Sequence, residues 1–318
     1  MRGYVIGRLL ALLPTLILAS IIVFVTVRLI PGDVIELMLS QNDVAADKMS
    51  RDQLVAALGL DKSMVTQYLH WVSSIVLRGD LGQSLWQGTA VTEHLRARLP
   101  VTFELGLIAL LVGLLIAVPI GIYSAIRQDT AGDYIARSFS ILLLAVPSFW
   151  LGTMVVVFPS IWWGWSPPVD FVPFFESPGA NLKQMLLPGI VLGAALSAIT
   201  MRMTRTMMLE VLRQDYIRTA WAKGLNEPLV ILRHALRNAL IPVVTLVGLQ
   251  APLLIGGAVI MEQIFVIPGM GLLLLDAVQQ RDYPIVTGVF LVVGVAVMLI
   301  NLLVDLSYGL LDPKVRLR

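Results

Sequence analysis

The chain of 318 residues contains no cysteine and few charges. The absence of cysteine excludes disulfide bridges, thiolate metal sites and cysteine nucleophiles, and it leaves the redox compartment undetermined. Charged residues make up 14% of the chain, against about 25% in a typical soluble domain. Hydrophobic residues make up 57%, and the mean hydropathy is +0.84. This composition indicates an integral membrane protein, and a net charge of +2 spread over short loops indicates no nucleic-acid partner.

The sequence also lacks the common catalytic and ligand-binding motifs. No phosphate-binding loop of the form G-x-x-x-x-G-K-[ST] is present, so we do not expect the chain to hydrolyse ATP itself. His70, His94 and His234 are far apart in the chain and lack metal-ligand spacing. No Ser-His-Asp arrangement is visible, and Glu104 alone in its apolar stretch cannot supply both an acid and a base. We therefore expect no catalytic residue, no metal site and no cofactor in this chain.

Six apolar stretches are long enough to cross a bilayer, which takes about 20 residues. They are residues 9–30, 101–126, 138–162, 185–207, 241–265 and 285–308. Arg2 and Arg8 precede the first stretch as in a signal peptide, but the stretch is too long and lacks a persuasive cleavage site. We interpret it as a retained membrane anchor. The expected fold is all-α, with six transmembrane helices and both termini on one side.

Lysine and arginine are distributed unequally between the two sides of the predicted membrane. Most of them lie on the side of the termini, whereas the short loops of the other side hold only Lys183 and Arg281. Because basic residues favour the cytoplasmic side, both termini and residues 208–240 are predicted to be cytoplasmic. Residues 31–100 then form an extracytoplasmic loop of a single transmembrane domain, 1–318.

The loop of residues 31–100 has helical signals of its own. Ser50 and Gln53 form a capping-box pattern before a short helix that Gly59 ends. Asp61 is a candidate N-cap for a second helix. The apolar stripe of this second helix consists of Met64, Val65, Tyr68, Leu69, Val72 and Val76. Such amphipathic helices suit a platform for an extracytoplasmic partner and simple packing over the bundle equally well.

Residues 210–242 are the longest basic segment between two strongly apolar stretches, so we expect the segment to face water. Helical spacing of apolar residues predicts a first helix that Gly224 ends, because glycine accepts a positive φ angle. Asn226 is a candidate N-cap, and Pro228 suits the first turn of a second helix. The apolar stripe of that helix is predicted to be Leu229, Leu232, Leu236 and Leu240. The predicted structure is helix, glycine turn, helix.

The fourth apolar stretch carries small residues at four-residue spacing, namely Gly189, Gly193 and Ser197. A small-residue face lets helices approach closely. We interpret it either as a surface facing a pathway through the membrane or a partner membrane subunit, or as packing within the bundle. The prolines in or near the ends of the stretches either break helices or lie in packed kinks, and they are Pro119, Pro147, Pro188, Pro242 and Pro252.

A secondary carrier usually places several ionisable groups near the middle of the membrane for ion coupling. Here Glu104, Asp305, Arg202 and Arg205 all lie near the ends of predicted spans. The energy source is therefore expected outside this chain, and a rigid, water-facing helical protrusion is able to dock on a separate ATPase. The alternatives are a stand-alone secondary transporter or channel, and a membrane scaffold that transports nothing.

Several motifs resemble those of one known family. They are RLIPGD (residues 28–33), LRGDLGQSL (77–85), RLPVTFEL (98–105), Arg218-Thr219-Ala220 followed by Gly224, EQIFVIPGMG (262–271), RDYP (281–284) and LLDPKVR (310–316). Together they resemble the first permease subunit of the dipeptide, oligopeptide and nickel group of binding-protein-dependent ABC importers, although the general family begins its cytoplasmic loop with Glu-Ala-Ala.

The resemblance implies the type I ABC importer (MetI-like) permease fold in the bacterial cytoplasmic (inner) membrane. It also implies a second, homologous permease as heterodimer partner, one or two cytoplasmic ATP-binding subunits that hold ATP and Mg²⁺, and an extracytoplasmic solute-binding protein. Substrates in this group are dipeptides, longer peptides, nickel chelates or some sugars. The residues expected to contact the ATPase are Asp215, Arg218, Thr219, Ala220, Lys223, Gly224, Leu225, Asn226, Glu227 and Arg233.

Overall fold

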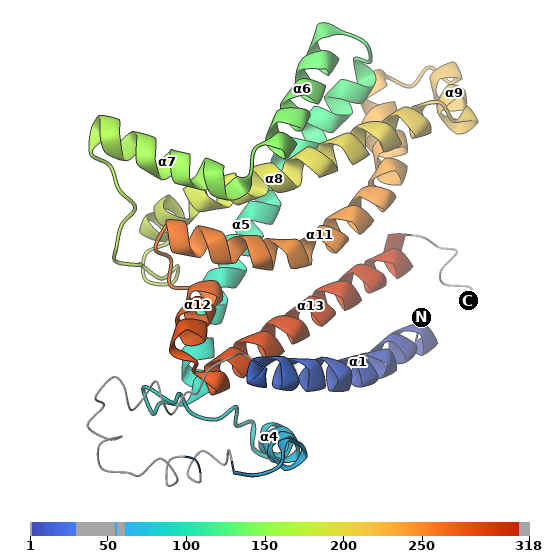
Figure 1. Cartoon of the computed structure of the whole chain (residues 1–318). Helices are drawn as coiled ribbons and strands as arrows, with labels where there is room; N and C mark the ends of the chain where they lie inside the picture. Colours follow the sequence, from blue (N-terminus) through green and yellow to red (C-terminus); the bar gives the residue numbers. More distant parts are fainter. Residues whose placement is uncertain (1, 30–54, 56–60, 312–318) are drawn as a thin grey trace. The chain divides into compact units, whose positions relative to one another are not determined.

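The computed structural model describes residues 2–29, 55 and 61–311, and these residues are almost entirely helical (Figure 1). The elements are α1 (Arg2–Arg28), α4 (Met64–Arg78), α5 (Val91–Ile126), α6 (Ala131–Ala145), α7 (Ser148–Trp163), α8 (Pro178–Leu212), α9 (Asp215–Ala222), α10 (Glu227–Leu229), the π-helix η1 (Val230–Ala235), α11 (Leu236–Ile264), α12 (Met270–Gln280) and α13 (Tyr283–Leu311). The predicted all-α class is confirmed. Apart from Val55, which is helical, the helix expected between Ser50 and Gly59 lies outside the described residues.

Five of the described helical segments are long and apolar enough to cross a membrane. They lie within α1, α5, α8, the continuous run from α10 to α11, and α13. A sixth span is obtained if α6 and α7 count as one bent span. Several of the observed helices extend well beyond the predicted limits, as in α5, which begins at Val91 rather than at residue 101.

The third predicted span, residues 138–162, is not one helix. The chain bends by 91° between α6 and α7. Proline has no backbone N–H and disfavours the helical conformation in the residue before it, and Val146 before Pro147 is extended, with φ −89° and ψ 119°. By contrast, Pro188, Pro242 and Pro252 lie inside continuous helices. The bend falls at Pro147, one of the prolines expected to break a helix or lie in a kink, and residues 138–162 form one span if α6 and α7 cross together as a bent pair.

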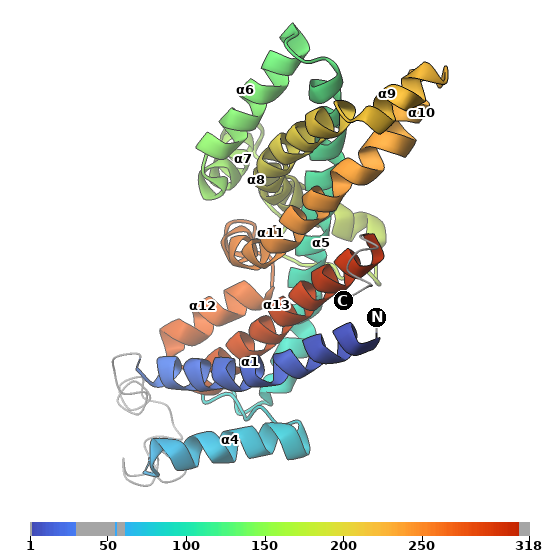
Figure 2. The same ribbon diagram turned by 90° about the vertical axis from the view of Figure 1, so that its right-hand side faces the viewer.

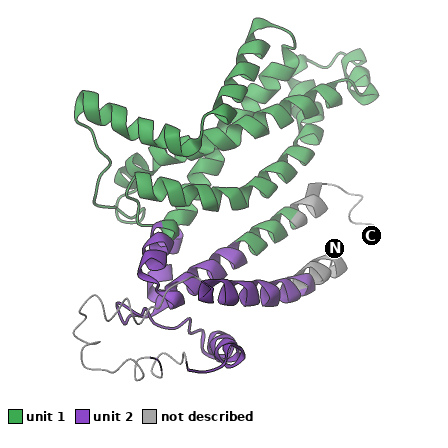
Figure 3. Ribbon diagram, in the orientation of Figure 1, with its two compact units in different colours: residues 1–5, 101–271, 297–318 green, residues 6–100, 272–296 purple. Residues whose placement is uncertain are grey.

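By its internal contacts, the chain divides into two compact units (Figure 3). Unit 1 consists of residues 1–5, 101–271 and 297–318, and unit 2 of residues 6–100 and 272–296. The single domain of residues 1–318 stays a prediction.

Helix α8 is the central helix of unit 1. In its apolar window 67% of the residues are buried, against 28% in the windows of α5 and of the α10–α11 run. Its residues Met185, Leu192 and Leu196 form a common core with Leu105 of α5 and Met261 of α11. The membrane-spanning part of unit 1 is therefore built around α8.

A buried carboxylate organises the turn between α11 and α12. Glu262 is fully buried and accepts hydrogen bonds from Thr102 Oγ1 at 2.5 Å and from the backbone N–H of Gly271 at 2.7 Å. The hydroxyl of Thr102 in turn accepts from the N–H of Met270 at 2.7 Å. Two backbone donors at the start of α12 are thus satisfied by side chains. A Cβ atom on Gly269 would collide with the Glu262 carboxylate, so this turn needs a glycine there.

A second polar contact in unit 1 joins α5 to the first turn of α8. The amide nitrogen of Asn181 donates to Glu104 Oε2 at 3.4 Å and to the carbonyl of Val172 at 3.1 Å. Two oxygens at this contact, the second carboxylate oxygen of Glu104 (Oε1) and the amide oxygen of Asn181 (Oδ1), are buried and have no hydrogen-bond partner among the described residues. A buried acceptor without a donor costs stability.

We expect the substitution Glu104→Gln to stabilise the protein by about 1 kcal/mol, because a neutral amide can accept from Asn181 and also donate to its free oxygen. The measurement is the thermal unfolding temperature of the detergent-solubilised protein. Glu176→Gln, at an exposed position outside the helices, is the control and should leave this temperature unchanged. A lower unfolding temperature for Glu104→Gln would show that the charged carboxylate is required.

In unit 2, α4 packs on α1 through part of its surface (Figure 2). The ring centroids of Phe24 and Tyr68 lie 5.3 Å apart, and the Tyr68 hydroxyl lies 2.9 Å from Ser20 Oγ. The N-cap of α4 is Ser63, which accepts from the N–H of Thr66, so the prediction of Asp61 as the N-cap was wrong. Exposed apolar residues of α4 are Met64, Val65, Leu69, Val76 and Leu77. The contacts with α1 are those of packing, and a partner platform stays a prediction.

Candidate coupling site

The short helix α9 lies at one end of unit 1, after the end of α8 (Figure 1). Its inner residues Ile217 and Ala220 are buried, whereas its other side chains are exposed. The two buried residues, Ile217 and Ala220, belong to an apolar group that we call the loop cluster. The loop cluster is formed by Ala125, Met208, Ile217, Ala220, Val230, Ile231, Ala235 and Ala239. The loop cluster joins α9 to the ends of α5 and α8, to η1 and to the start of α11.

Burial of this inner face fixes α9 firmly. Full burial of one isoleucine side chain contributes about 1.5–3 kcal/mol, and Ile217 is fully buried. A hydrogen bond adds to this, because Asn238 Nδ2 of α11 donates to the Tyr216 hydroxyl at 2.7 Å. A force on α9 is therefore passed to the helices that it contacts.

The turn after α9 has the geometry that the sequence predicts. Gly224 has φ +78°, the left-handed conformation that glycine accepts and other residues avoid. The N–H of Leu225 bonds to the carbonyl of Ala220, which closes the end of the helix. Asn226 is confirmed as the N-cap of α10, since its Oδ1 accepts from the N–H of Leu229 at 3.3 Å.

The helices on either side of this turn differ from the prediction. The chain from residue 210 is not one helix up to Gly224, because α8 ends at Leu212 and α9 begins at Asp215. After the turn, α10 continues through the π-helix η1 into α11 without a break. A π-helix has wider turns than an α-helix and often occurs at functional sites.

The predicted leucine stripe was wrong. Leu232 is 60% exposed, and the buried residues of this segment are Val230, Ile231, Ala235 and Ala239. The prediction assumed a regular α-helical period starting at Leu229, and the π-helical turns change which residues face α9.

The structure brings the predicted coupling residues together at this end of unit 1. The exposed ones are Asp215, Arg218, Thr219, Lys223, Gly224, Asn226, Glu227 and Arg233, whereas Leu225 is half-buried and Ala220 is buried. Arg218 forms an exposed ion pair with Asp215 at 3.3 Å. Such a pair contributes little to stability, so both charges are available to a partner.

Two aromatic residues that the sequence did not place at the site are also exposed there. Tyr216 is 42% and Trp221 41% exposed, on either side of the buried pair Ile217 and Ala220. From the sequence, Trp221 counts as one of the apolar residues whose helical spacing predicts the first helix of residues 210–242. Aromatic residues on an exposed helix are typical anchors of protein interfaces, and this was the available signal.

The small-residue face of α8 lies against α5. A Cβ atom on Gly189 would lie 2.5 Å from Ile108 Cγ2, and one on Gly193 would lie 2.5 Å from the carbonyl oxygen of Ala109. Ser197 is fully buried and donates to the carbonyl of Ala194 at 2.7 Å. At Gly189 and Gly193 the face therefore packs within the bundle. A surface toward the pathway or a partner permease stays a prediction.

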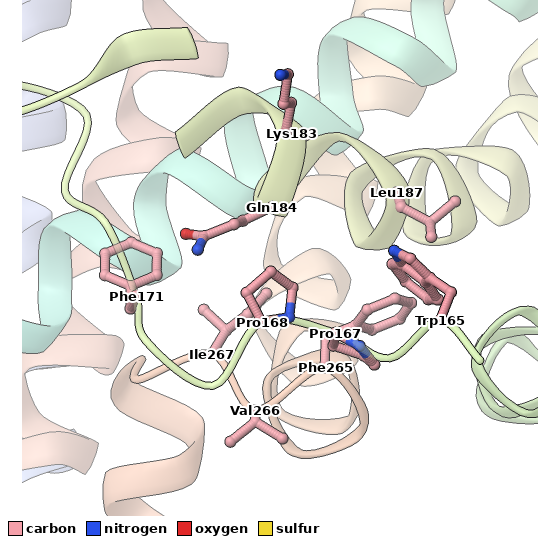
Figure 4. Close-up of a pocket in the computed structure, with 10 residues that line it drawn as sticks. All are labelled: Trp165, Pro167, Pro168, Phe171, Lys183, Gln184, Leu187, Phe265, Val266 and Ile267. Atoms are coloured by element: carbon pink, nitrogen blue, oxygen red, sulfur yellow. The ribbon is translucent and has the colours of Figure 1, made fainter. Parts of the chain in front are cut away.

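A small cavity lies between the 165–171 segment, α8 and the end of α11 (Figure 4). Its lining consists of Trp165, Pro167, Pro168, Phe171, Lys183, Gln184, Leu187, Phe265, Val266 and Ile267. Its volume of about 20 Å³ has room for about one water molecule and is far too small for a peptide.

Among the described residues, five or six apolar segments of membrane-spanning length define an integral membrane protein. Residues 117–317 match the family described as "Binding-protein-dependent transport system inner membrane component", and residues 1–106 match the N-terminal family of the same transport systems. The chain belongs to this family of ABC importer permeases. The membership confirms the resemblance, the permease function and the location in the bacterial inner membrane.

Individual relatives agree with this assignment. The dipeptide transport system permease protein DppB of Escherichia coli (strain K12) is 38% identical over 339 residues, which cover 99% of both chains. The glutathione transport system permease protein GsiC of Pectobacterium atrosepticum is 40% identical over 318 residues, again 99% of both. The inward-facing MetNI methionine ABC transporter has a TM-score of 0.53 at 16% identity, over 70% of this chain and 97% of that one, and confirms the type I permease fold.

Proposed function

We propose that this chain forms half of the translocation pathway of a peptide importer and couples to a cytoplasmic ATPase subunit through residues 208–240. The observation that carries the proposal is α9, an exposed helix whose inner face is locked to three spans of the permease. The relatives named for dipeptide and glutathione transport support a peptide substrate. The basic residues of the loop support its cytoplasmic orientation.

Membership of the importer family supports the proposed partners. A second, homologous permease supplies the other half of the pathway, and one or two ATP-binding subunits hold ATP and Mg²⁺, because this chain has no phosphate-binding loop. An extracytoplasmic binding protein delivers the solute. ATP-driven closure of the ATPase subunits moves α9, and the loop cluster passes this movement to α5, α8 and α11.

Trp221→Ala tests the contact with the ATPase. We expect this variant to weaken retention of the ATPase subunit by about 2 kcal/mol, because an exposed tryptophan at the centre of an interface is a typical hot spot. The measurement is the amount of ATPase subunit that co-purifies with the permease at increasing dilution. Trp163→Ala is the matched control, since Trp163 is 74% exposed on α7. Equal retention in both variants would remove Trp221 from the interface. A wild-type permease that retains no ATPase would refute the proposed function.

A further inference from the structure

A buried ion pair lies close to the coupling site and joins three helices. Arg205 of α8 donates from Nε to Asp133 Oδ1 at 2.8 Å and from Nη2 to Asp133 Oδ2 at 2.7 Å. Ser124, near the end of α5, donates its hydroxyl to Asp133 Oδ1 and accepts from Arg205 Nε at 3.0 Å. The backbone N–H of Asp129 donates to Asp133 Oδ2 at 3.1 Å. Asp133 is fully buried, and the Arg205 side chain is 20% exposed.

Further contacts keep α6 and α5 in register with α8. Ser140 of α6 donates to the carbonyl of Ala198 at 2.9 Å, two helical turns away from the ion pair on both helices. Helix α6 therefore runs antiparallel to α8 and is fixed at two points. Gly121 of α5 allows α5 to pack closely against α8, because a Cβ atom there would lie 2.7 Å from Thr204 Cβ and 2.9 Å from the carbonyl oxygen of Met201.

The ion pair is next to the loop cluster on two helices. On α8, Met208 lies one turn after Arg205 and is fully buried in the loop cluster. On α5, the residue after Ser124 is Ala125, another member of the loop cluster. A displacement of α9 therefore reaches α8 and α5 at the level of the ion pair. Helix α6 contributes no residue to the loop cluster. The ion pair between Asp133 and Arg205 therefore connects α6 to α8 at the level where a displacement of α9 arrives.

We propose that Asp133 and Arg205 are positioning residues that make α6 move together with α8 when the ATPase moves α9. The inference rests on the proposed function. The two parallel hydrogen bonds of the guanidinium group fix orientation as well as distance, which an apolar contact between helices does not. Separating the pair leaves a buried charge without its partner, so the two helices respond to a force as one body.

Arg205→Lys is the test, because lysine keeps the charge and loses the two-bond geometry. The chain has no cysteine, so spin labels can be attached at Ile135→Cys on α6 and Glu210→Cys on α8, both exposed. The complete importer is reconstituted in liposomes. The distance between the labels is then measured by electron paramagnetic resonance, without nucleotide and after trapping with ATP and vanadate.

With Arg205 in place, we expect the same label distance in both states. In Arg205→Lys, the distance distribution should shift or broaden after trapping, and the uptake of labelled dialanine per ATP hydrolysed should fall about fivefold or more, the lower range of coupling between sites. Arg202→Lys, the same change at an exposed position of α8, should behave like the parent chain. A purely structural defect would reduce the amount of complex but leave this ratio unchanged.

Ser124→Ala is the second variant in case Arg205→Lys does not assemble, and a smaller effect in the same direction is expected, because only the bridging hydroxyl is lost. If the label distance in the protein with Arg205 changes on trapping, the inference is overturned. It is also overturned if Arg205→Lys and Ser124→Ala both behave like the parent chain. Both of these results leave the proposed function standing. An importer whose permease retains no ATPase subunit refutes the proposed function, and the inference with it.

Discussion

Replacing Gly193 by alanine is expected to destabilise unit 1 by about 3 kcal/mol, at the upper end of the usual cost of overpacking. The added Cβ atom would lie 2.5 Å from the carbonyl oxygen of Ala109 and 3.1 Å from the backbone nitrogen of Gly113. Both atoms belong to the backbone of α5, so no side-chain rotation relieves the clash, and the two helices have to separate. The measurement is the thermal unfolding temperature in detergent, together with the amount of protein in the membrane.

Gly106→Ala is the matched control for this prediction. Gly106 also lies inside α5, but a Cβ atom there would meet nothing within 4 Å. Because alanine favours the helix over glycine by about 1 kcal/mol, this variant should be slightly more stable than the parent. Equal unfolding temperatures for Gly193→Ala and Gly106→Ala would show that α5 and α8 do not approach as closely as described.

The second large effect is expected from Gly224→Val, which should abolish most peptide uptake while insertion into the membrane stays normal. Gly224 has φ +78°, and a left-handed conformation costs a residue with a Cβ atom about 1–2 kcal/mol, with β-branched residues the least tolerant. Since 1.4 kcal/mol is a factor of ten, docking of the ATPase should weaken about tenfold or more. Uptake of labelled dipeptides and co-purification of the ATPase subunit are the measurements.

The control at the same position is Gly224→Asn. A Cβ atom at this position would meet nothing within 4 Å, so only the backbone conformation distinguishes the two variants. Asparagine adopts the left-handed conformation more readily than other residues, so this variant should keep most of the uptake. Undiminished uptake by Gly224→Val would contradict the assignment of residues 208–240 as the coupling loop.

Both predictions concern glycines that the sequence singled out, but the structure gives them different roles. At Gly224 the sequence was sufficient, because a glycine that ends a helix is a local feature, and so is the N-cap Asn226. At Gly193 the spacing of small residues predicted a close approach of helices. The neighbour that approaches is α5, which only the packed bundle identifies.

The structure differs from the sequence-based predictions where the chain departs from regular helices. The bend at Pro147 divides one predicted span into α6 and α7, and the π-helix η1 changes the buried face after Gly224. A hydrophobic period assumes an unbroken α-helix, so it cannot detect a wider turn.

Membership of a membrane, the position of most spans and the glycine turn after α9 all follow from the amino-acid sequence, because they depend on apolar length and on local turn residues. Which polar groups meet follows only from the packing of the helices. Asp133 and Arg205, Glu104 and Asn181, and Thr102 and Glu262 are each far apart in the chain. Their contacts depend on how the helices pack, since each of these buried or half-buried side chains has a hydrogen-bond partner on another element of the fold.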